Sequence, residues 1–186
     1  MKLGKIAYVI LDALHADPGS GYDVKALVDR STRYFWAASY GQIYPELRRL
    51  LDEHLVDGES SPTGGRARTV YRLTDAGRAE LVRWLGERDA GYEFRDLGLL
   101  KLFFSDVGGP DGDRLAALRR LRADREAVLG RLRELQSKVP EHVRGGAPEL
   151  VLEYGIGMHE WIVNWCDDVE RRLLAGSAAA TGEEPT

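Results

Sequence analysis

Residues 39–74 read SYGQIYPELRRLLDEHLVDGESSPTGGRARTVYRLT, and they predict a helix followed directly by a β-hairpin. The helix is expected from Ser39 to Glu53, because apolar residues recur there at spacings of three and four and form one stripe. The stripe, which we predict to be buried, consists of Ile43, Leu47, Leu50, Leu51 and Leu55. A proline is costly in a helix interior and tolerated in the first turn, so Pro45 favours a helix that begins not far before it, near Ser39 or Tyr40.

The opposite side of this helix carries polar, aromatic and cationic side chains that are free to face outward. It consists of Tyr40, Gly41, Gln42, Tyr44, Pro45, Arg48 and Arg49. In the major groove of DNA, a glutamine amide can bind adenine through two hydrogen bonds, and an arginine can bind guanine or phosphate. The amides of a helix N-terminus also favour phosphate. This side therefore predicts a helix that enters a major groove.

The hairpin is expected to have strands at residues 55–59 and 69–73, which alternate apolar and polar residues at period two. From Ser60 to Arg72 the only charged residues are Arg66, Arg68 and Arg72. Arginine beside glycine is typical of contact with phosphates or a minor groove, because the backbone can approach closely there. Taken alone, the segment fits a solvated loop equally well; the preceding helix favours DNA contact.

Two further helices are predicted upstream. The first contains Leu3, Ile6, Ala7, Ile10, Leu11 and Leu14 at helical spacing. Residues 17–19, Asp-Pro-Gly, end it, and Ser20 with Asp23 three residues later has the pattern of an N-cap for the second helix. The order helix, helix, helix, hairpin indicates a winged helix-turn-helix, in which the third helix enters the major groove.

After the hairpin, Thr74 is expected to cap a fourth helix at residues 75–88. Its buried side should hold Leu81, Trp84 and Leu85. A further helix is indicated by Leu97, Leu100, Lys101 and Phe104, and a Gly-rich loop at residues 107–112 should end it.

A heptad pattern dominates residues 118–139. Leu118, Leu121, Arg125, Val128, Leu132, Leu135 and Val139 are spaced three and four apart, which predicts a helix that needs a partner helix. The partner can be the last helix of the same chain, from Pro148 to about Leu174, or the same helix of a second subunit. The last helix repeats Val151, Tyr154, Met158, Trp161, Trp165, Val169 and Leu173 at similar spacing. Arg125 can fix the register, meet a carboxylate or, as we favour, extend to water.

Several short motifs resemble the PadR family of bacterial transcriptional regulators. They are Leu3-Gly4, Ser20-Gly21-Tyr22, the helix start and body at residues 39–50, Gly65-Arg66 and residues 71–77. The match covers the first 85 or so residues motif by motif, and the remainder fits the helical C-terminal domain of longer members in outline. The resemblance implies a homodimeric, ligand-responsive repressor that binds an inverted-repeat operator, often near its own gene.

The resemblance also assigns residues by position. It implies a DNA-facing set of Tyr22, Ser39, Tyr40, Gln42, Tyr44, Arg48 and Arg49, with Gly65, Arg66 and Arg68 on the wing. At residue 68 the family commonly has a basic residue of either kind, so the resemblance carries only a phosphate-binding role there.

The chain is expected to be mainly α-helical with a small β-hairpin wing and to divide into two domains. These are a winged-helix DNA-binding domain at 1–88 and a helical dimerisation domain at 93–175, followed by a disordered tail at 176–186. Residues 1–88 hold 13 Lys and Arg against 12 Asp and Glu, and the remainder holds 13 against 18. DNA affinity should therefore rest on a few local phosphate contacts rather than on a broad basic surface.

The helical domain is also the expected place for an effector. Its aromatic residues can line an apolar cavity for a small aromatic or hydrophobic ligand, or they can be ordinary core. The candidates are Phe94, Phe103, Phe104, Tyr154, Trp161 and Trp165.

The sequence contains no motif typical of an enzyme or of a metal-binding protein. Position 163 is Val, so His159-Glu160 does not continue into a zinc-binding pair, and no catalytic constellation, metal site or cofactor site is expected. The single cysteine, Cys166, is expected to be a packed residue; no signal peptide or membrane span is predicted, and the location should be cytoplasmic. The alternative function is a winged-helix ligand-binding or protein-interaction module that does not bind DNA.

Overall fold

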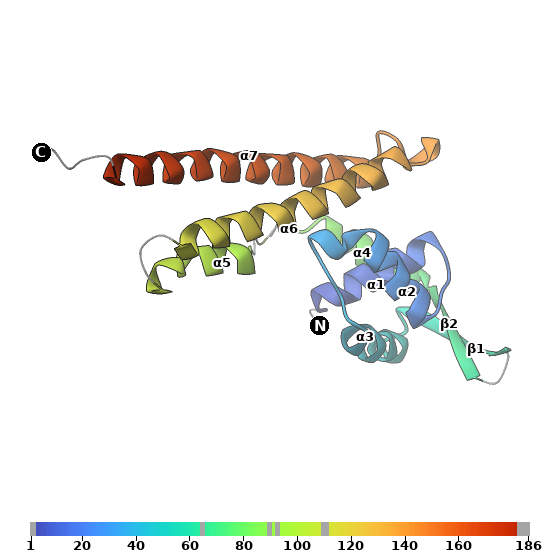
Figure 1. Ribbon diagram of the computed structural model, residues 1–186. Helices are drawn as coiled ribbons and strands as arrows, with labels where there is room; N and C mark the ends of the chain where they lie inside the picture. Colours follow the sequence, from blue (N-terminus) through green and yellow to red (C-terminus); the bar gives the residue numbers. More distant parts are fainter. Residues whose placement is uncertain (1–2, 64–65, 89–90, 92–93, 109–111, 182–186) are drawn as a thin grey trace, which may run out of the picture. The chain divides into compact units, whose positions relative to one another are not determined.

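The computed structural model describes residues 3–63, 66–88, 91, 94–108 and 112–181 (Figure 1). The chain divides into two compact units, Met1–Tyr92 and Glu93–Thr186, which we call the winged-helix unit and the helical unit. Among the described residues, no helix has the length and apolar character needed to cross a bilayer.

The winged-helix unit has the predicted order of three helices, a hairpin and a fourth helix (Figure 1). Its elements are α1 (Lys5–Ala16), α2 (Gly21–Arg30), the 3₁₀ turn η1 (Thr32–Tyr34), α3 (Tyr40–Asp52), β1 (Val56–Thr63), β2 (Arg66–Leu73) and α4 (Asp75–Leu85). The predicted fold class, mainly α with a small wing, is confirmed.

The buried stripe of α3 lies at the centre of this unit. Ile43, Leu47 and Leu50 are fully buried, while Leu51 and Leu55 pack against the same core from its edge. Each fully buried side chain of this size stabilises the fold by about 1.5–3 kcal/mol relative to an exposed one. The stripe therefore fixes which side of α3 remains exposed.

The hairpin is longer than predicted. β1 and β2 pair antiparallel from Val56 opposite Leu73 to Thr63 opposite Arg66, so the ladder includes residues that the sequence assigned to the turn. Ladder pairing uses backbone groups, and polar side chains therefore do not end it. An isolated bridge adds Gly19 to the edge of β2: Gly19 N donates to Tyr71 O at 3.0 Å, and Tyr71 N donates to Gly19 O at 2.8 Å.

The start of α4 is fixed to the start of the hairpin. Thr74 Oγ1 lies 2.9 Å from the His54 carbonyl oxygen and 3.0 Å from that of Leu55, and it accepts a hydrogen bond from Gly77 N at 3.0 Å. A Cβ on Gly77 would lie 2.1 Å from the Leu55 carbonyl oxygen, so this close approach requires glycine. The predicted Thr74 cap is confirmed.

One prediction for α4 is wrong. Leu85 was expected on the buried side, but it is the last residue of the helix and 68% exposed, whereas Leu81 is buried and Trp84 packs against the core. The helix ends three residues earlier than expected, so Leu85 leaves the core at the point where the chain turns away.

The helical unit contains α5 (Leu97–Phe103), η2 (Ser105–Gly108), α6 (Gly112–Ser137), η3 (Glu141–Val143) and α7 (Ala147–Thr181). α6 and α7 lie side by side, with α5 against α6 (Figure 1). Leu118 and Leu121 of the heptad pattern pack with Ile162 and Cys166 of α7. The pairing within one chain, which the sequence left open, is therefore present.

The buried side of α7 differs from the predicted stripe. It is formed by Ile156, His159, Ile162 and Cys166, whereas Tyr154 and Trp161 of the predicted stripe are exposed. Four residues of the predicted stripe, Met158, Trp165, Val169 and Leu173, do pack against the buried cluster, so the prediction was right in part. The helix is apolar on more than one side, and spacing alone therefore does not separate the buried residues from the exposed ones. α7 also continues to Thr181 instead of ending near Leu174, so the tail predicted at 176–186 is helical over 176–181; residues 182–186 lie outside the described part.

The prediction that Arg125 extends to water is wrong, because Arg125 is paired within the protein. Its guanidinium forms an ion pair with Asp96, whose side chain is only 5% exposed. Asp96 also accepts a hydrogen bond from Leu99 N at 3.0 Å and so caps α5. A nearly buried carboxylate needs a charged partner, and the polar residue in the heptad pattern provides it.

Candidate nucleic-acid interface

The exposed side of α3 begins with a capping arrangement. Ser39 precedes the helix, and its N and Oγ donate to Gln42 Oε1 at 3.0 and 3.1 Å. The amide oxygen of Gln42 is thereby used within the protein, and its amino group remains a donor. The two-bond contact with adenine expected from the sequence needs both groups, so this cap must open before it can form. The Ser-x-x-Gln spacing could have predicted the cap.

Two tyrosines form the middle of this side. Tyr40 and Tyr44 are each 44% exposed, and their ring centroids lie 6.1 Å apart in a stacked arrangement. Lys25 Nζ of α2 lies 5.5 Å from the Tyr40 ring centroid. The Tyr44 ring also lies over Gly21, where an added Cβ would come within 2.6 Å of Tyr44 Cε1. Glycine at the start of α2 thus lets α3 pack closely, and the neighbouring Tyr22 points to solvent, 63% exposed.

The two arginines of α3 differ in their surroundings. Arg49 donates to Glu53 Oε1 at 3.0 Å and to Glu46 Oε1 at 3.4 Å, so its charge is balanced on its own helix. Arg48 is exposed and forms no ion pair with any residue the structure describes. Arg48 is therefore the cation of α3 that is available to a ligand.

On the wing, Arg68 contacts the helix-turn-helix rather than solvent alone. Its Nη2 donates to Asp23 Oδ2. Asp23 belongs to the predicted cap of α2, which is confirmed: Ser20 N and Ser20 Oγ both donate to Asp23 Oδ2 at 2.8 Å. These hydrogen bonds from Ser20, with a smaller effect of Arg68, lower the pKa of Asp23. The backbone of Arg66 opens β2 opposite Thr63, and Gly65 lies outside the described residues.

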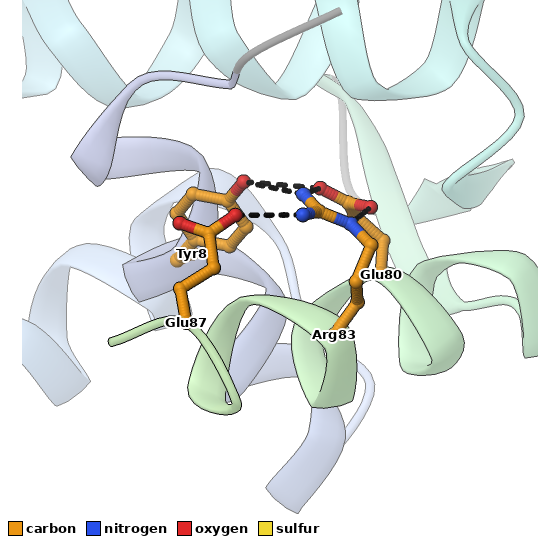
Figure 2. Close-up of polar contacts among 4 residues, drawn as sticks. All are labelled: Tyr8, Glu80, Arg83 and Glu87. Atoms are coloured by element: carbon orange, nitrogen blue, oxygen red, sulfur yellow. Dashed lines mark hydrogen bonds and ion pairs between the residues drawn. The ribbon is translucent and has the colours of Figure 1, made fainter. Parts of the chain in front are cut away.

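A polar cluster joins α1 to α4 and the residues just after it, as Figure 2 shows. Tyr8 Oη donates to Glu80 Oε1 at 3.0 Å, Arg83 Nε donates to Glu80 Oε2 at 2.7 Å, and Arg83 Nη1 donates to Glu87 Oε1 at 2.6 Å. The Tyr8 ring stacks on Trp84 with centroids 4.4 Å apart. The hydrogen bond from Arg83 lowers the pKa of Glu80. The sequence analysis missed this cluster, although the spacing of Glu80, Arg83 and Glu87 is that of helical ion pairs.

The aromatic residues proposed for an effector are mostly on the surface of the helical unit. Phe94, Phe103, Phe104, Tyr154 and Trp161 are each more than half exposed, and Trp165 is partly buried. The structure brings together Phe103 with Phe104 and Trp161 with Trp165, at centroid distances of 5.2 and 6.4 Å. Within one chain the five exposed residues are neither the lining of an enclosed cavity nor ordinary core.

A groove of about 460 Å³ does lie between α6 and α7, but it uses other residues. It is open to solvent and is lined by Glu126, Leu129, Gly130, Arg133, Glu160, Val163 and Asn164. None of the aromatic candidates belongs to it.

The histidine and cysteine of α7 are buried. His159 is only 3% exposed, and burial lowers its pKa. Cys166 is fully buried, as expected for a packed residue, and burial raises the pKa of its thiol. Over the described ranges, no three His, Cys, Asp or Glu side chains gather as a metal site would require.

Comparison with known proteins identifies the family to which this chain belongs. The model of the transcriptional regulator PadR-like family matches residues 10–83, and that of the virulence activator alpha C-terminal domain matches residues 94–173. The probable transcriptional regulator Rv1176c of Mycobacterium tuberculosis is 31% identical over 183 residues, which is 90% of this chain and 97% of the relative. This chain belongs to the PadR-like family.

Two solved structures of a PadR-like regulator resemble the chain along most of its length. Bacillus subtilis PadR in complex with operator DNA has a TM-score of 0.78 and 26% identity, covering 90% of this chain and 98% of that one. The same regulator in complex with p-coumaric acid has a TM-score of 0.72 and 25% identity, with the same coverage. The two matched family regions follow the two units, and a PadR-like winged helix with a helical C-terminal region is therefore the fold of this chain.

Proposed function

We propose that this protein is a cytoplasmic, dimeric repressor that binds an inverted-repeat operator in double-stranded DNA and is released by a small effector. The observation that carries the proposal is the exposed side of α3, where Tyr40, Tyr44 and Arg48 surround a capped N-terminus. The complex of B. subtilis PadR with operator DNA supports it, since the chain shares that fold.

In this proposal α3 lies in the major groove and β1–β2 lies along the adjacent backbone. Arg48 binds guanine or phosphate, and the free amino group of Gln42 donates to a base acceptor. The remaining contacts, to phosphate and sugar, are assigned to Tyr22, Ser39, Tyr40, Tyr44, Arg49, Gly65, Arg66 and Arg68.

The helical unit provides the dimer in this proposal. α5 and η2 expose Leu97, Leu100, Phe103, Phe104 and Val107, and α7 exposes Leu150, Val151, Tyr154 and Trp161. Monomeric proteins seldom expose so many large apolar side chains over one small domain, because leaving them in water is unfavourable. A second copy would cover them and place two α3 helices about one DNA turn, or about 34 Å, apart.

The effector is proposed to be a small aromatic or hydrophobic molecule, as the complex of B. subtilis PadR with p-coumaric acid supports. The candidates remain Phe94, Phe103, Phe104, Tyr154, Trp161 and Trp165, which would enclose a ligand only where other surfaces cover them. Because coupling between two ligands is reciprocal, operator DNA should weaken effector binding by the same factor by which the effector weakens DNA binding.

The test is selection of bound duplexes from a random library, followed by sedimentation of the purified protein. We expect an enriched palindrome whose half-sites lie about one helical turn apart, and a dimer in solution. A protein that enriches no sequence at low ionic strength would contradict the proposal and leave the protein-interaction alternative. Enrichment of an unpaired half-site by a monomer would contradict the dimeric operator.

A further inference from the structure

Asp23 has an unusual position, because one oxygen of its carboxylate serves two elements. Oδ2 accepts from Ser20 N and Oγ at the start of α2, and it also accepts from the Arg68 guanidinium of β2, 45 residues away. At the base of the hairpin, Gly19 pairs with Tyr71. The wing is therefore held to the start of α2 at two points, one of them an ion pair.

The ion pair is accessible from solvent. The Arg68 side chain is 53% exposed and the Asp23 side chain 44% exposed. Ion pairs this exposed are weak, because water and salt screen them. Phosphate oxygens are strong competing acceptors for a guanidinium. A phosphate that reached Arg68 while the pair was intact would lie next to the Asp23 carboxylate and be repelled by it.

We propose that Asp23 is an internal competitor for the wing arginine, and that DNA binding transfers Arg68 from Asp23 to a phosphate. This inference rests on the proposed DNA-binding function. Asp23 lowers the affinity for DNA and holds the wing in place while no DNA is bound. Because hydrogen bonds from Ser20 keep the pKa of Asp23 low, the carboxylate remains a competitor at every pH near neutrality.

The arginines of α3 show why Arg68 differs. Arg49 is paired with Glu46 of α3 and with Glu53, the residue that caps the end of α3, so releasing it breaks no link to another element. Releasing Arg68 removes a link between β2 and α2. The exchange therefore couples phosphate contact to loss of one of the two links between the wing and the start of α2.

The experiment measures dissociation constants for the duplex that selection enriches, by fluorescence anisotropy. Asp23→Asn keeps an oxygen for the Ser20 cap but removes the charge, and it should bind about two- to fivefold more tightly than wild type at low salt. Asp12→Asn is the matched control, since Asp12 is exposed on α1 and forms no ion pair with any described residue. It should show no comparable gain.

The variant Arg68→Ala tests whether Asp23 weakens DNA binding by competing for Arg68 or merely by adding negative charge to the surface. Asp23→Asn should give no gain in the Arg68→Ala background, which is the coupling that a double-mutant cycle measures. Equal gains in both backgrounds, or weaker binding by Asp23→Asn with an unchanged melting temperature, would overturn the inference.

Salt dependence provides a second measurement that does not need the Asp23 variant to fold. The slope of log affinity against log salt concentration is negative, and if Arg68 binds a phosphate, Arg68→Ala should make this slope less negative by about 0.9. An unchanged slope would overturn the transfer. Wild-type protein that binds no duplex would instead contradict the proposed function, so the two failures are distinguishable.

Discussion

The two units of this PadR-like protein treat their large side chains in opposite ways. The winged-helix unit buries its leucines, isoleucines and valines around α3 and exposes tyrosines and arginines on the other side of that helix. The helical unit has a smaller buried cluster along α6 and α7 and exposes phenylalanines, leucines and tryptophan. This difference supports the proposal that a second copy covers the exposed side chains of the helical unit.

The largest expected effect is on the core of the winged-helix unit. Leu47→Ala removes a fully buried side chain from α3 and should lower the free energy of unfolding by about 2–5 kcal/mol. DNA binding should be lost while the helical unit still associates, as denaturant unfolding and sedimentation would measure. Loss of association in this variant would show that the units do not fold independently. Leu51→Ala, at the edge of the same core, is the control and should cost less.

The next effect concerns the exposed side of the helical unit. Phe103→Asp places a charge where a side chain is 80% exposed, so the monomer should keep its melting temperature. The dimer should weaken at least tenfold, by about 1.4 kcal/mol or more, because burying an unpaired charge in an apolar interface is unfavourable. Sedimentation at several concentrations measures the dissociation constant of the dimer. Val82→Asp on α4 is the control. Equal weakening of the dimer by both variants would contradict the assignment of the dimer interface to the helical unit.

A smaller effect separates the two arginines of α3. Arg48→Ala should weaken operator binding by about 1–3 kcal/mol if the guanidinium contacts a guanine, and less if it contacts phosphate. Arg49→Ala should weaken binding less, because Glu46 and Glu53 already balance that charge. Mobility shifts of both variants decide between them. A greater loss for Arg49→Ala would show that its ion pairs open on the duplex.

The smallest effect is a difference in acid response. The folded pKa of His159 is lowered, so its contribution to stability is full above the ordinary value of 6.5 and is lost as pH falls through the folded pKa. The lowered pKa values of Asp23 and Glu80 act in the same direction, but only below their ordinary values of 3.8 and 4.5. The helical unit should therefore weaken first on acidification.

Hydrogen exchange at decreasing pH would locate that loss. Protection in α6 and α7 should fall before protection in α1–α4. His159→Leu should remove the early step, since it removes the group that takes up the proton. An early step that persists in this variant would assign the acid response to another group.

The winged-helix unit was largely predictable from sequence because its signals are local. The caps at Ser20 and Thr74, the break at residues 17–19 and the stripe of α3 each depend on a few neighbouring residues. The contact between Arg68 and Asp23 was not predictable, since no local pattern relates residues that lie 45 apart in the chain. The cap formed by Ser39 and Gln42 was missed, although the Ser-x-x-Gln spacing predicts it.

The helical unit was predicted less well for a physical reason. α7 carries apolar residues on several sides, so a stripe through Tyr154 and Trp161 fits helical spacing as well as the buried stripe through Ile156 and Ile162. The burial of His159 was not predicted from the sequence, because no local pattern marks a polar residue as buried. The pairing of Arg125 depends on Asp96, which precedes it by 29 residues.

The bridge between Gly19 and Tyr71 has a consequence for biosynthesis. The backbone groups that open α2 find their partners in a strand made about fifty residues later, and Tyr71 itself is part of the core. As the chain leaves the ribosome from its N-terminus, the first three helices must wait for the hairpin before their packing is finished. A nascent chain stalled ahead of residue 71 would thus expose apolar surface, and chaperones should bind it until translation resumes.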